Sequence, residues 1–201
     1  MFADSVLAYF AAALIAYLLG SVSGAIVSSH VGHHEDIRDF GSGNAGMTNA
    51  LRTYGIRHAA IVAAIDILKT VAAILAAKWL IGWKWGFVIG SLFAIAGHLF
   101  PVYYGFKGGK GILVTFAAML AINWIPALIL LGVFGVIVAI NRYVSLGSII
   151  AAACYPVAVY IFSVLQEDSC SVINLILSGL IGAMLIFMHR SNIKRLLSHS
   201  E

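Results

Sequence analysis

Long apolar stretches separated by short polar segments dominate this 201-residue chain. We count seven apolar segments, at about 5–28, 56–81, 85–104, 112–125, 127–141, 146–165 and 172–188. Most approach the roughly 20 residues that a helix needs to cross about 30 Å of hydrocarbon. The short segment 112–125 predicts a tilted or re-entrant piece. Strict alternation, which is typical of a membrane β-barrel, is not evident. The pattern predicts an all-α integral membrane protein with about seven transmembrane helices in a single multi-pass domain over 1–201.

Composition strengthens this prediction. Hydrophobic residues make up 62% of the chain and charged residues 10%, with a mean hydropathy of +1.00. A soluble domain usually carries about 25% charged residues. The net charge of +4 falls mainly in short loops, which indicates membrane topology and anionic lipids or substrates rather than nucleic acid. No basic region precedes the first apolar segment, which therefore predicts an uncleaved spanning helix rather than a signal peptide.

The distribution of lysine and arginine predicts the orientation. If the N-terminus lies outside, the outer loops hold only Lys78 and Lys84. The inner loops then hold nine basic residues, Arg38, Arg52, Arg57, Lys107, Lys110, Arg142, Arg190, Lys194 and Arg195. This bias predicts an outside N-terminus and a cytoplasmic C-terminus. Every polar stretch rich in glycine or basic residues then faces the cytoplasm, where a shared site for a cytosolic anion is expected.

The first of these stretches, residues 41–49, reads Gly-Ser-Gly-Asn-Ala-Gly-Met-Thr-Asn, and Arg52 follows. Glycines let successive backbone N–H groups turn toward an anion, and a helix N-terminus strengthens such a site. The stretch predicts a phosphate cradle, to which Arg52 adds a planar cationic fork. Its spacing also matches the dinucleotide fingerprint, but the βαβ unit which that reading needs is not evident. A glycine-rich turn is the plainer alternative.

Two further stretches are candidate partners of this cradle. Residues 106–111 read Phe-Lys-Gly-Gly-Lys-Gly, which places Lys107 and Lys110 beside open backbone amides without the spacing of a Walker A loop. His98 lies just upstream. Residues 189–196 read His-Arg-Ser-Asn-Ile-Lys-Arg-Leu. If this stretch is helical, His189 and Asn192 share a face. The plainer alternatives are a flexible positive-inside loop for the second stretch and a basic lipid anchor for the third.

Other polar residues are open to structural explanations. Asp66 and Lys69 are spaced to pair within one membrane helix, either as a structural pair or as support for the site from behind. Cys154 and Cys170 would lie about 24 Å apart in one straight helix, so no disulfide is expected.

Histidines near the end of the first apolar segment suggest two further patterns. His30, His33 and His34 have helical metal-ligand spacing, but without a convergent ligand or supporting contacts we predict no metal site. His34 and Asp39 form an H-x-x-x-x-D pair, known from a different group of glycerolipid acyltransferases, which we interpret as chance.

Taken in order, the polar stretches resemble the bacterial membrane glycerol-3-phosphate acyltransferases that use acyl-phosphate as donor. The resemblance rests on residues 41–49 with Arg52, on Gly-His-x-x-Pro followed by Phe-Lys-Gly-Gly-Lys-Gly, and on His-Arg-x-Asn-Ile-x-Arg-Leu. The loop from Arg142 to Leu146 also fits. The resemblance extends from Leu19 to the C-terminus. Two departures are His199, where the family usually has glycine, and the histidine-rich stretch 30–35.

The resemblance implies seven helices, a cytoplasmic active site and location in the bacterial inner membrane. It implies transfer of a fatty acyl group from acyl-phosphate to the 1-hydroxyl of glycerol 3-phosphate. The products are lysophosphatidic acid and phosphate, at the first step of phospholipid synthesis. Membrane lipid surrounds the enzyme. No cofactor, metal or obligatory protein partner is implied, and we expect a monomer.

Each candidate residue receives a role on this basis. The catalytic candidates are Ser42, near the reacting hydroxyl, and His98, which orients a group or assists proton transfer. The acyl-phosphate is assigned to Gly43, Asn44, Gly46, Thr48, Asn49 and Lys110. Glycerol 3-phosphate is assigned to Ser42, Arg52, Lys110, His189 and Asn192. Lys107 and Ser145 are supporting candidates. No Ser–His–Asp triad is apparent, so direct attack is favoured over an acyl-Ser42 intermediate.

Two non-enzymatic alternatives remain open at this point. A transporter for a phosphorylated metabolite would place its anion near the membrane midplane, often between repeated halves. A lipid-binding scaffold is the second alternative. No internal repeat is evident and the polar motifs cluster on one side of the predicted membrane. Both observations favour an interfacial enzyme.

Overall fold

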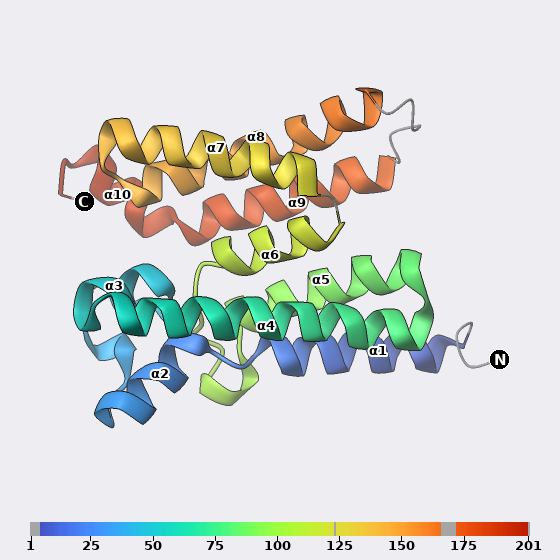
Figure 1. Cartoon of the computed structure of the whole chain (residues 1–201), viewed down its shortest axis with the longest axis horizontal. Coiled ribbons are helices and arrows are strands. Elements are labelled where there is room, and N and C mark those ends of the chain that lie inside the picture. Colours follow the sequence, from blue (N-terminus) through green and yellow to red (C-terminus); the bar gives the residue numbers. More distant parts are fainter. Residues whose placement is uncertain (1–4, 123, 166–171, 201) are drawn as a thin grey trace. The chain divides into compact units, whose positions relative to one another are not determined.

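The computed structural model describes residues 5–122, 124–165 and 172–200, and every regular element in them is helical. The chain divides into two compact units, residues 1–122 and 123–201, and each is described by itself. Figure 1 shows the elements in chain order. Cys170 lies outside the described residues, so the prediction of no disulfide stays untested, and Cys154 is a partly buried residue of the second unit.

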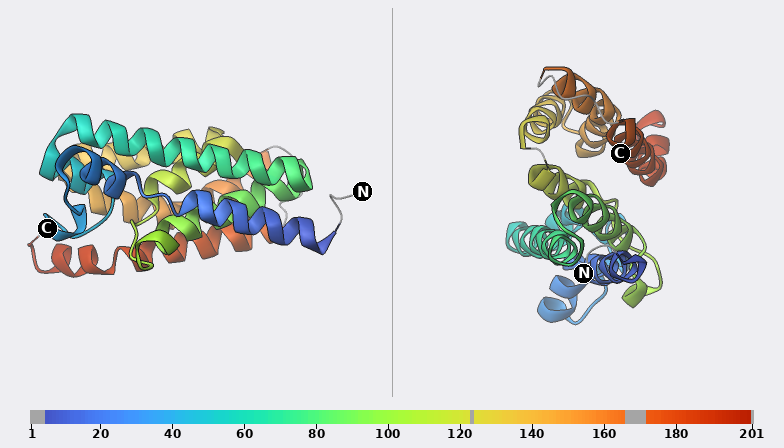
Figure 2. Two further views of the ribbon diagram at one scale, coloured as in Figure 1. Left: turned by 90° about the horizontal axis from the view of Figure 1, so that it is seen from below. Right: turned by 90° about the vertical axis from the view of Figure 1, so that its right-hand side faces the viewer.

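The first unit is built on three long helices that pack against one another. Its elements are α1 (Val6–Gly20), α2 (Gly24–His33), η1 (Ile37–Asp39), α3 (Met47–Tyr54), α4 (Ile56–Ile81), α5 (Trp83–Leu99), η2 (Val102–Tyr104) and α6 (Ile112–Ile122). Helices α1, α4 and α5 form the bundle, as the views in Figure 2 show, while α6 packs on α4 and α5. Helices α2 and α3 pack beside α4, and the first polar stretch runs from the loop after η1 into the start of α3.

Small residues let these helices approach closely. A Cβ added at Gly20 of α1 would lie 2.4 Å from the Ala94 carbonyl oxygen of α5, and one at Gly90 would lie 2.7 Å from the Ile74 Cα of α4. The buried alanines Ala16, Ala73 and Ala94 fill the same interface. Close backbone approach is the packing solution expected in lipid, where burial of apolar surface gives little drive for helix association.

The pattern predicted one continuous helix for the first apolar segment, but the structure divides this segment into two helices. It breaks between α1 and α2, and the apolar stretch runs on to His33. Two charged side chains of α4 bind the backbone groups that the break exposes: Asp66 Oδ1 accepts from Gly24 N at 3.3 Å, and Lys69 Nζ donates to the Val22 carbonyl oxygen. A break in hydrocarbon is tolerated where other groups satisfy the freed backbone. This pair therefore supports the break.

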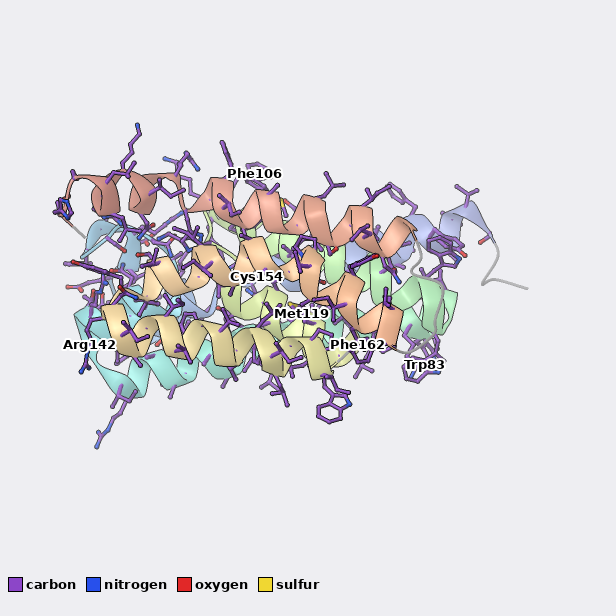
Figure 3. The ribbon with its side chains drawn as sticks, turned by 90° about the horizontal axis from the view of Figure 1, so that it is seen from above. Trp83, Phe106, Met119, Arg142, Cys154 and Phe162 are labelled. Carbon is purple, nitrogen blue, oxygen red and sulfur yellow. The ribbon has the colours of Figure 1, made fainter. Side chains whose placement is uncertain are left out.

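The second unit is a short helical bundle. It contains α7 (Trp124–Asn141), α8 (Val144–Leu165), α9 (Val172–Met188) and α10 (Arg190–Leu197). Helix α8 packs against both α7 and α9, and α10 packs against α8 and α9. Figure 3 shows Arg142 at the turn between α7 and α8. Helices α9 and α10 form a pair bent by 57°. The bend places His189 at the junction.

Each of the seven predicted apolar segments overlaps a helix over most of its length. Five helical stretches are long and apolar enough to cross a membrane, or up to six if the bent α9–α10 pair is one span. Helix α6 is shorter, with 11 residues. The all-helical membrane fold is thus confirmed for the described residues. The count of seven spans and the orientation stay predictions.

Candidate functional site

The first polar stretch forms a tight loop that leads into α3. Gly41 and Gly43 have φ angles of 58° and 70°, which are favourable for glycine. The loop is fastened by the buried side chain of Asn49, which lies in the first turn of α3. Asn49 Oδ1 accepts from Ser42 N at 2.9 Å, and its Nδ2 donates to the carbonyl oxygens of Ile37 and Phe40 at 3.1 and 3.0 Å. Asn49 thereby fixes the shape of the loop.

The loop leads into α3, whose N-terminus has no side-chain cap. Gly46 is the N-cap residue and no side chain hydrogen-bonds to the first turn. The first-turn amides of any α-helix have no acceptor within the helix, and the helix dipole favours an anion there. Ser42 and Gly43 are exposed, Asn44 and Thr48 are partly buried, and Arg52 is exposed in the last turn of α3. Backbone donors, hydroxyls and a cation thus lie on one short segment.

The second polar stretch folds back against the end of α5. Gly108 N donates to the Leu99 carbonyl oxygen and Gly109 N to that of His98, both at 3.2 Å. Gly109 is buried, and a Cβ added to it would lie 2.3 Å from His98 Nε2 and 2.7 Å from the Ala45 carbonyl oxygen. Gly109 therefore sits where the two polar stretches and the His98 imidazole meet. Only a residue without a side chain fits there.

Arg38, which lies in η1 just before the first polar stretch, binds the backbone around the second. Its Nη1 donates to the carbonyl oxygens of Tyr104 and Lys107 at 2.8 and 3.2 Å, and its Nη2 lies 2.6 Å from Asp36 Oδ2. The sequence analysis had treated Arg38 only as a positive-inside charge. An arginine two residues after an aspartate was the available signal, but its partners on residues 104 and 107 come only from the fold.

The Asp36–Arg38 contact predicts a pH dependence of stability. Hydrogen bonds from Arg38 hold the pKa of the Asp36 carboxyl below its usual 3.8. A lowered folded-state pKa means that the contact stabilises the fold above the usual pKa and that this stabilisation is lost as the pH falls through the folded-state value. We expect the Tm difference between wild type and Asp36→Asn to be largest near neutral pH and to shrink below 3.8. A difference independent of pH would contradict this.

A buried polar network lies behind the second stretch. Lys69 Nζ is 2.8 Å from Asp66 Oδ1 and 2.9 Å from His98 Nδ1, and all three side chains are buried. A lysine ammonium only donates, so His98 Nδ1 accepts and the proton of the neutral ring lies on Nε2. The predicted pairing of Asp66 and Lys69, which both readings share, is confirmed. The contact with His98 adds a direct link from this pair to a candidate catalytic residue.

The remaining candidates lie in the second unit. His189 is buried at the N-cap of α10, and its Nδ1 is 2.8 Å from the Leu185 carbonyl oxygen. Asn192 is buried one turn later, consistent with the face that the sequence predicted. Ser145, in the first turn of α8, is buried and its Oγ has no hydrogen-bond partner among the described residues. A buried hydroxyl without a partner is costly unless another group meets it, which suits a ligand contact.

Within the first unit, the structure brings the loop 41–49 and His98 together at Gly109, and Lys107 and Lys110 lie on the same short stretch as Gly109. Lys107 is exposed and Lys110 partly buried. The H-x-x-x-x-D alternative gains no support: His34 is the C-cap residue of α2, Asp39 lies in η1, and no hydrogen bond or ion pair joins them in the described part of the chain.

The fold and these loops define a class: an integral membrane protein with a glycine-rich, donor-rich loop at the start of a helix. Comparisons then name the group. Residues 10–199 match the sequence pattern of the family described as glycerol-3-phosphate acyltransferase. This chain therefore belongs to the glycerol-3-phosphate acyltransferase family, and it is an acyltransferase of phospholipid synthesis.

Individual relatives agree over nearly the full chain. A protein named glycerol-3-phosphate acyltransferase from Thermoanaerobacter sp. strain X514 is 39% identical over 189 residues, covering 94% of this chain and 92% of its own. One of the same name from Clostridioides difficile is 39% identical and covers 98% and 95%. The crystal structure of PlsY (YgiH), an integral membrane glycerol 3-phosphate acyltransferase, in its glycerol 3-phosphate form, has a TM-score of 0.82 at 34% identity, covering 96% and 94%. These matches do not support the transporter alternative.

Proposed function

We propose that this chain transfers a fatty acyl group from acyl-phosphate to the 1-hydroxyl of sn-glycerol 3-phosphate. The products are 1-acyl-glycerol 3-phosphate and inorganic phosphate. One observation carries the proposal: an uncapped helix start, loop glycines and flanking cations form an anion cradle in a chain that belongs to this family. Both proposed substrates carry phosphate, and the apolar helices give the acyl chain a lipid environment.

In the proposed reaction, the glycerol 3-phosphate hydroxyl attacks the acyl carbon directly. The new ester C–O bond forms as the bond from the acyl carbon to the phosphate oxygen breaks, and a phosphate oxygen takes the hydroxyl proton. Phosphate is already a good leaving group, so positioning and charge stabilisation do most of the work. A covalent acyl-Ser42 species, trapped with donor alone, would overturn direct attack in favour of a two-step path.

The proposed roles keep the assignments made from the sequence, except where contacts within the first unit change them. Gly43 N and Gly46 N donate to the carbonyl oxygens of Phe40 and Asn44 and shape the loop. In this proposal the other backbone amides between Asn44 and Thr48 bind the phosphate of the donor together with Lys110. Arg52 and Lys110 bind glycerol 3-phosphate, with Ser42 near its hydroxyl, and the assignment of His189 and Asn192 to the same substrate stays a prediction from the sequence. We revise the role of Asn49, because its amide group is already bonded to Ile37, Phe40 and Ser42. Asn49 shapes the cradle and does not contact the substrate.

His98 is proposed to act as a neutral donor through Nε2. Its Nδ1 faces Lys69, and its Nε2 faces the junction of the two polar stretches at Gly109. A hydrogen-bond donor at that point stabilises negative charge on a phosphate or on the tetrahedral carbon centre. Lys107 and Ser145 are supporting residues in this proposal.

The proposed topology has seven spans, an outside N-terminus and a cytoplasmic site in the inner membrane of a bacterium. Support comes from the nine basic residues assigned to inner loops against two in outer loops. We expect a monomer that needs no cofactor, metal or protein partner for the reaction. Labelling of variants with a single cysteine at residue 42 or 78 by an impermeant thiol reagent tests the orientation. Residue 78 should react from the outside, and residue 42 only after the membrane is permeabilised.

The deciding assay measures phosphate release by purified protein in lipid, given palmitoyl-phosphate with and without glycerol 3-phosphate. Release that depends on glycerol 3-phosphate, with an equal amount of lysophosphatidic acid, supports the proposal. If only acyl-coenzyme A serves as donor, the proposed donor is wrong and the His34–Asp39 interpretation returns. Uptake of a phosphorylated solute into vesicles without any acyl transfer would contradict the enzymatic proposal.

Replacing Arg52 or Lys110 with alanine should weaken substrate binding. A hydrogen bond to a charged group contributes about 1.5–3 kcal/mol, which corresponds to a rise in KM of roughly 10- to 150-fold. The effect should appear for glycerol 3-phosphate in both variants and for acyl-phosphate only in Lys110→Ala. Arg57→Ala, an exposed arginine at the start of α4, is the matched control. Unchanged kinetic constants for Lys110→Ala would contradict the shared position of this lysine.

A further inference from the structure

A pair of histidines from two different helices lies outside the proposed active site. His33 ends α2 and His58 lies in the first turn of α4. Their Nε2 atoms are 3.2 Å apart. The sequence analysis had considered His30, His33 and His34 as metal ligands and rejected them for want of a convergent ligand and supporting contacts. The structure supplies both for His33, and it takes the convergent ligand from another helix.

Neighbouring residues hold both rings in place. Ser28 Oγ lies 2.9 Å from His58 Nδ1, and Gly32 leaves room for the His58 ring, because a Cβ there would lie 2.6 Å from His58 Cε1. His33 stacks on Tyr54, with ring centroids 4.1 Å apart and planes within 13°. A metal-binding histidine is commonly oriented by an oxygen that accepts a hydrogen bond from its other ring nitrogen, and Ser28 Oγ can serve as that acceptor. The rings are therefore oriented before any ligand binds.

We propose that His33 and His58 form a binding site for a borderline divalent cation, Zn²⁺, Ni²⁺ or Cu²⁺, which bridges α2 and α4 through the two Nε2 atoms. Nitrogens bound to one tetrahedral Zn²⁺ at about 2.0–2.1 Å lie about 3.3–3.4 Å apart, and neighbouring ligands of a tetragonal Cu²⁺ lie about 2.9 Å apart. The observed 3.2 Å falls between these values. Imidazole suits these metals, whereas Mg²⁺ and Ca²⁺ prefer oxygen ligands.

The site supplies two protein ligands, and water completes the coordination. In the described residues, no group of three or more His, Cys, Asp or Glu is arranged to hold a metal. His33 is exposed and His58 is partly buried, so water and cations reach the pair. Binding requires that both rings carry their proton on Nδ1, and Ser28 Oγ accepts such a proton from His58. Selectivity then comes from the ligand type alone.

The position of the pair connects it to the cradle without making it part of the active site. His33 and His58 flank the segment 34–57, which contains η1, the glycine-rich loop and α3. A cation held by both ends closes this segment into a loop and limits the motion of its chain. We expect slower amide hydrogen exchange in residues 36–46 when the cation is bound. This expectation does not depend on which acyl donor the enzyme uses.

Titration of the full-length protein in lipid with Cu²⁺, after removal of any histidine tag, tests the proposal. Electron paramagnetic resonance should show one Cu²⁺ per chain with two nitrogen ligands. His33→Phe keeps the ring that stacks on Tyr54 and should lose the signal, as should His58→Phe. Ser28→Ala should weaken binding by about 10- to 100-fold. His34→Asn, an exposed neighbour with φ of 56° that asparagine tolerates, should bind as wild type.

A second measurement keeps the test independent of folding. Zn²⁺ should raise the Tm of wild type and of His34→Asn, and should leave that of His33→Phe unchanged, while Mg²⁺ should shift none of them. Metal-free Tm values establish that the variants are folded. An unchanged Cu²⁺ signal in His33→Phe and His58→Phe, or no binding by wild type, would overturn the proposal. The two rings would then only share a hydrogen bond.

Discussion

Replacing Lys69 with methionine is expected to destabilise the protein by about 3–5 kcal/mol, because it leaves the buried Asp66 carboxylate without its partner. The same change removes the donors to the Val22 carbonyl oxygen and to His98 Nδ1. The backbone at the break between α1 and α2 should lose a hydrogen bond, and the His98 ring should lose the contact that orients it. Acyl transfer should therefore fall even under conditions in which the variant is still folded.

Denaturant titration of the protein in detergent measures the change in the free energy of unfolding. The double variant Asp66→Asn with Lys69→Met should recover part of the loss, since no unpaired charge remains. Lys78→Met, on the same helix, is the control, because Lys78 only covers the ring of Trp83 at 3.2 Å near the end of α4. A loss no larger for Lys69→Met than for Lys78→Met would show that the pair does not support the fold.

Gly109→Ala is expected to lower kcat/KM on the order of 10²-fold, because a displacement of about 1 Å in a positioned site has costs of that size. The added methyl would meet the Ala45 carbonyl oxygen and His98 Nε2 at 2.7 and 2.3 Å, so one of the two polar stretches or the imidazole must move. Overpacking of this kind should also cost about 1–3 kcal/mol of stability.

Steady-state kinetics with both substrates separate these effects. Gly132→Ala is the matched control, because nothing lies within 4 Å of a Cβ added there, and it should keep full activity. If Gly109→Ala retained kcat/KM within about twofold while folded, the position of Gly109 at the junction would not matter for catalysis, and the proposed role of His98 Nε2 would lose its main geometric support.

The close match between the predicted segments and the helices has a simple cause. Segment 56–81 coincides with α4, and segments 112–125 and 172–188 contain α6 and α9. A helix in hydrocarbon must satisfy its own backbone, so a long apolar run has few alternatives to helix. The break after Gly20 escaped prediction because its stabilising partners are distant in the sequence. Its freed backbone groups are bound by Asp66 and Lys69, which lie more than 40 residues away in the chain.

Sequence by itself determined the class of protein, the helical segments and the candidate anion-binding stretches, because residue type and local spacing carry these properties. Only the tertiary structure decided which polar groups remain available. It showed that Asn49 is occupied by its own loop, that Arg38 binds the carbonyl oxygens of Tyr104 and Lys107, and that His33 meets His58 rather than His30 or His34. A side chain's free donors depend on neighbours brought by folding, and the spacing of residues along one helix does not reveal them.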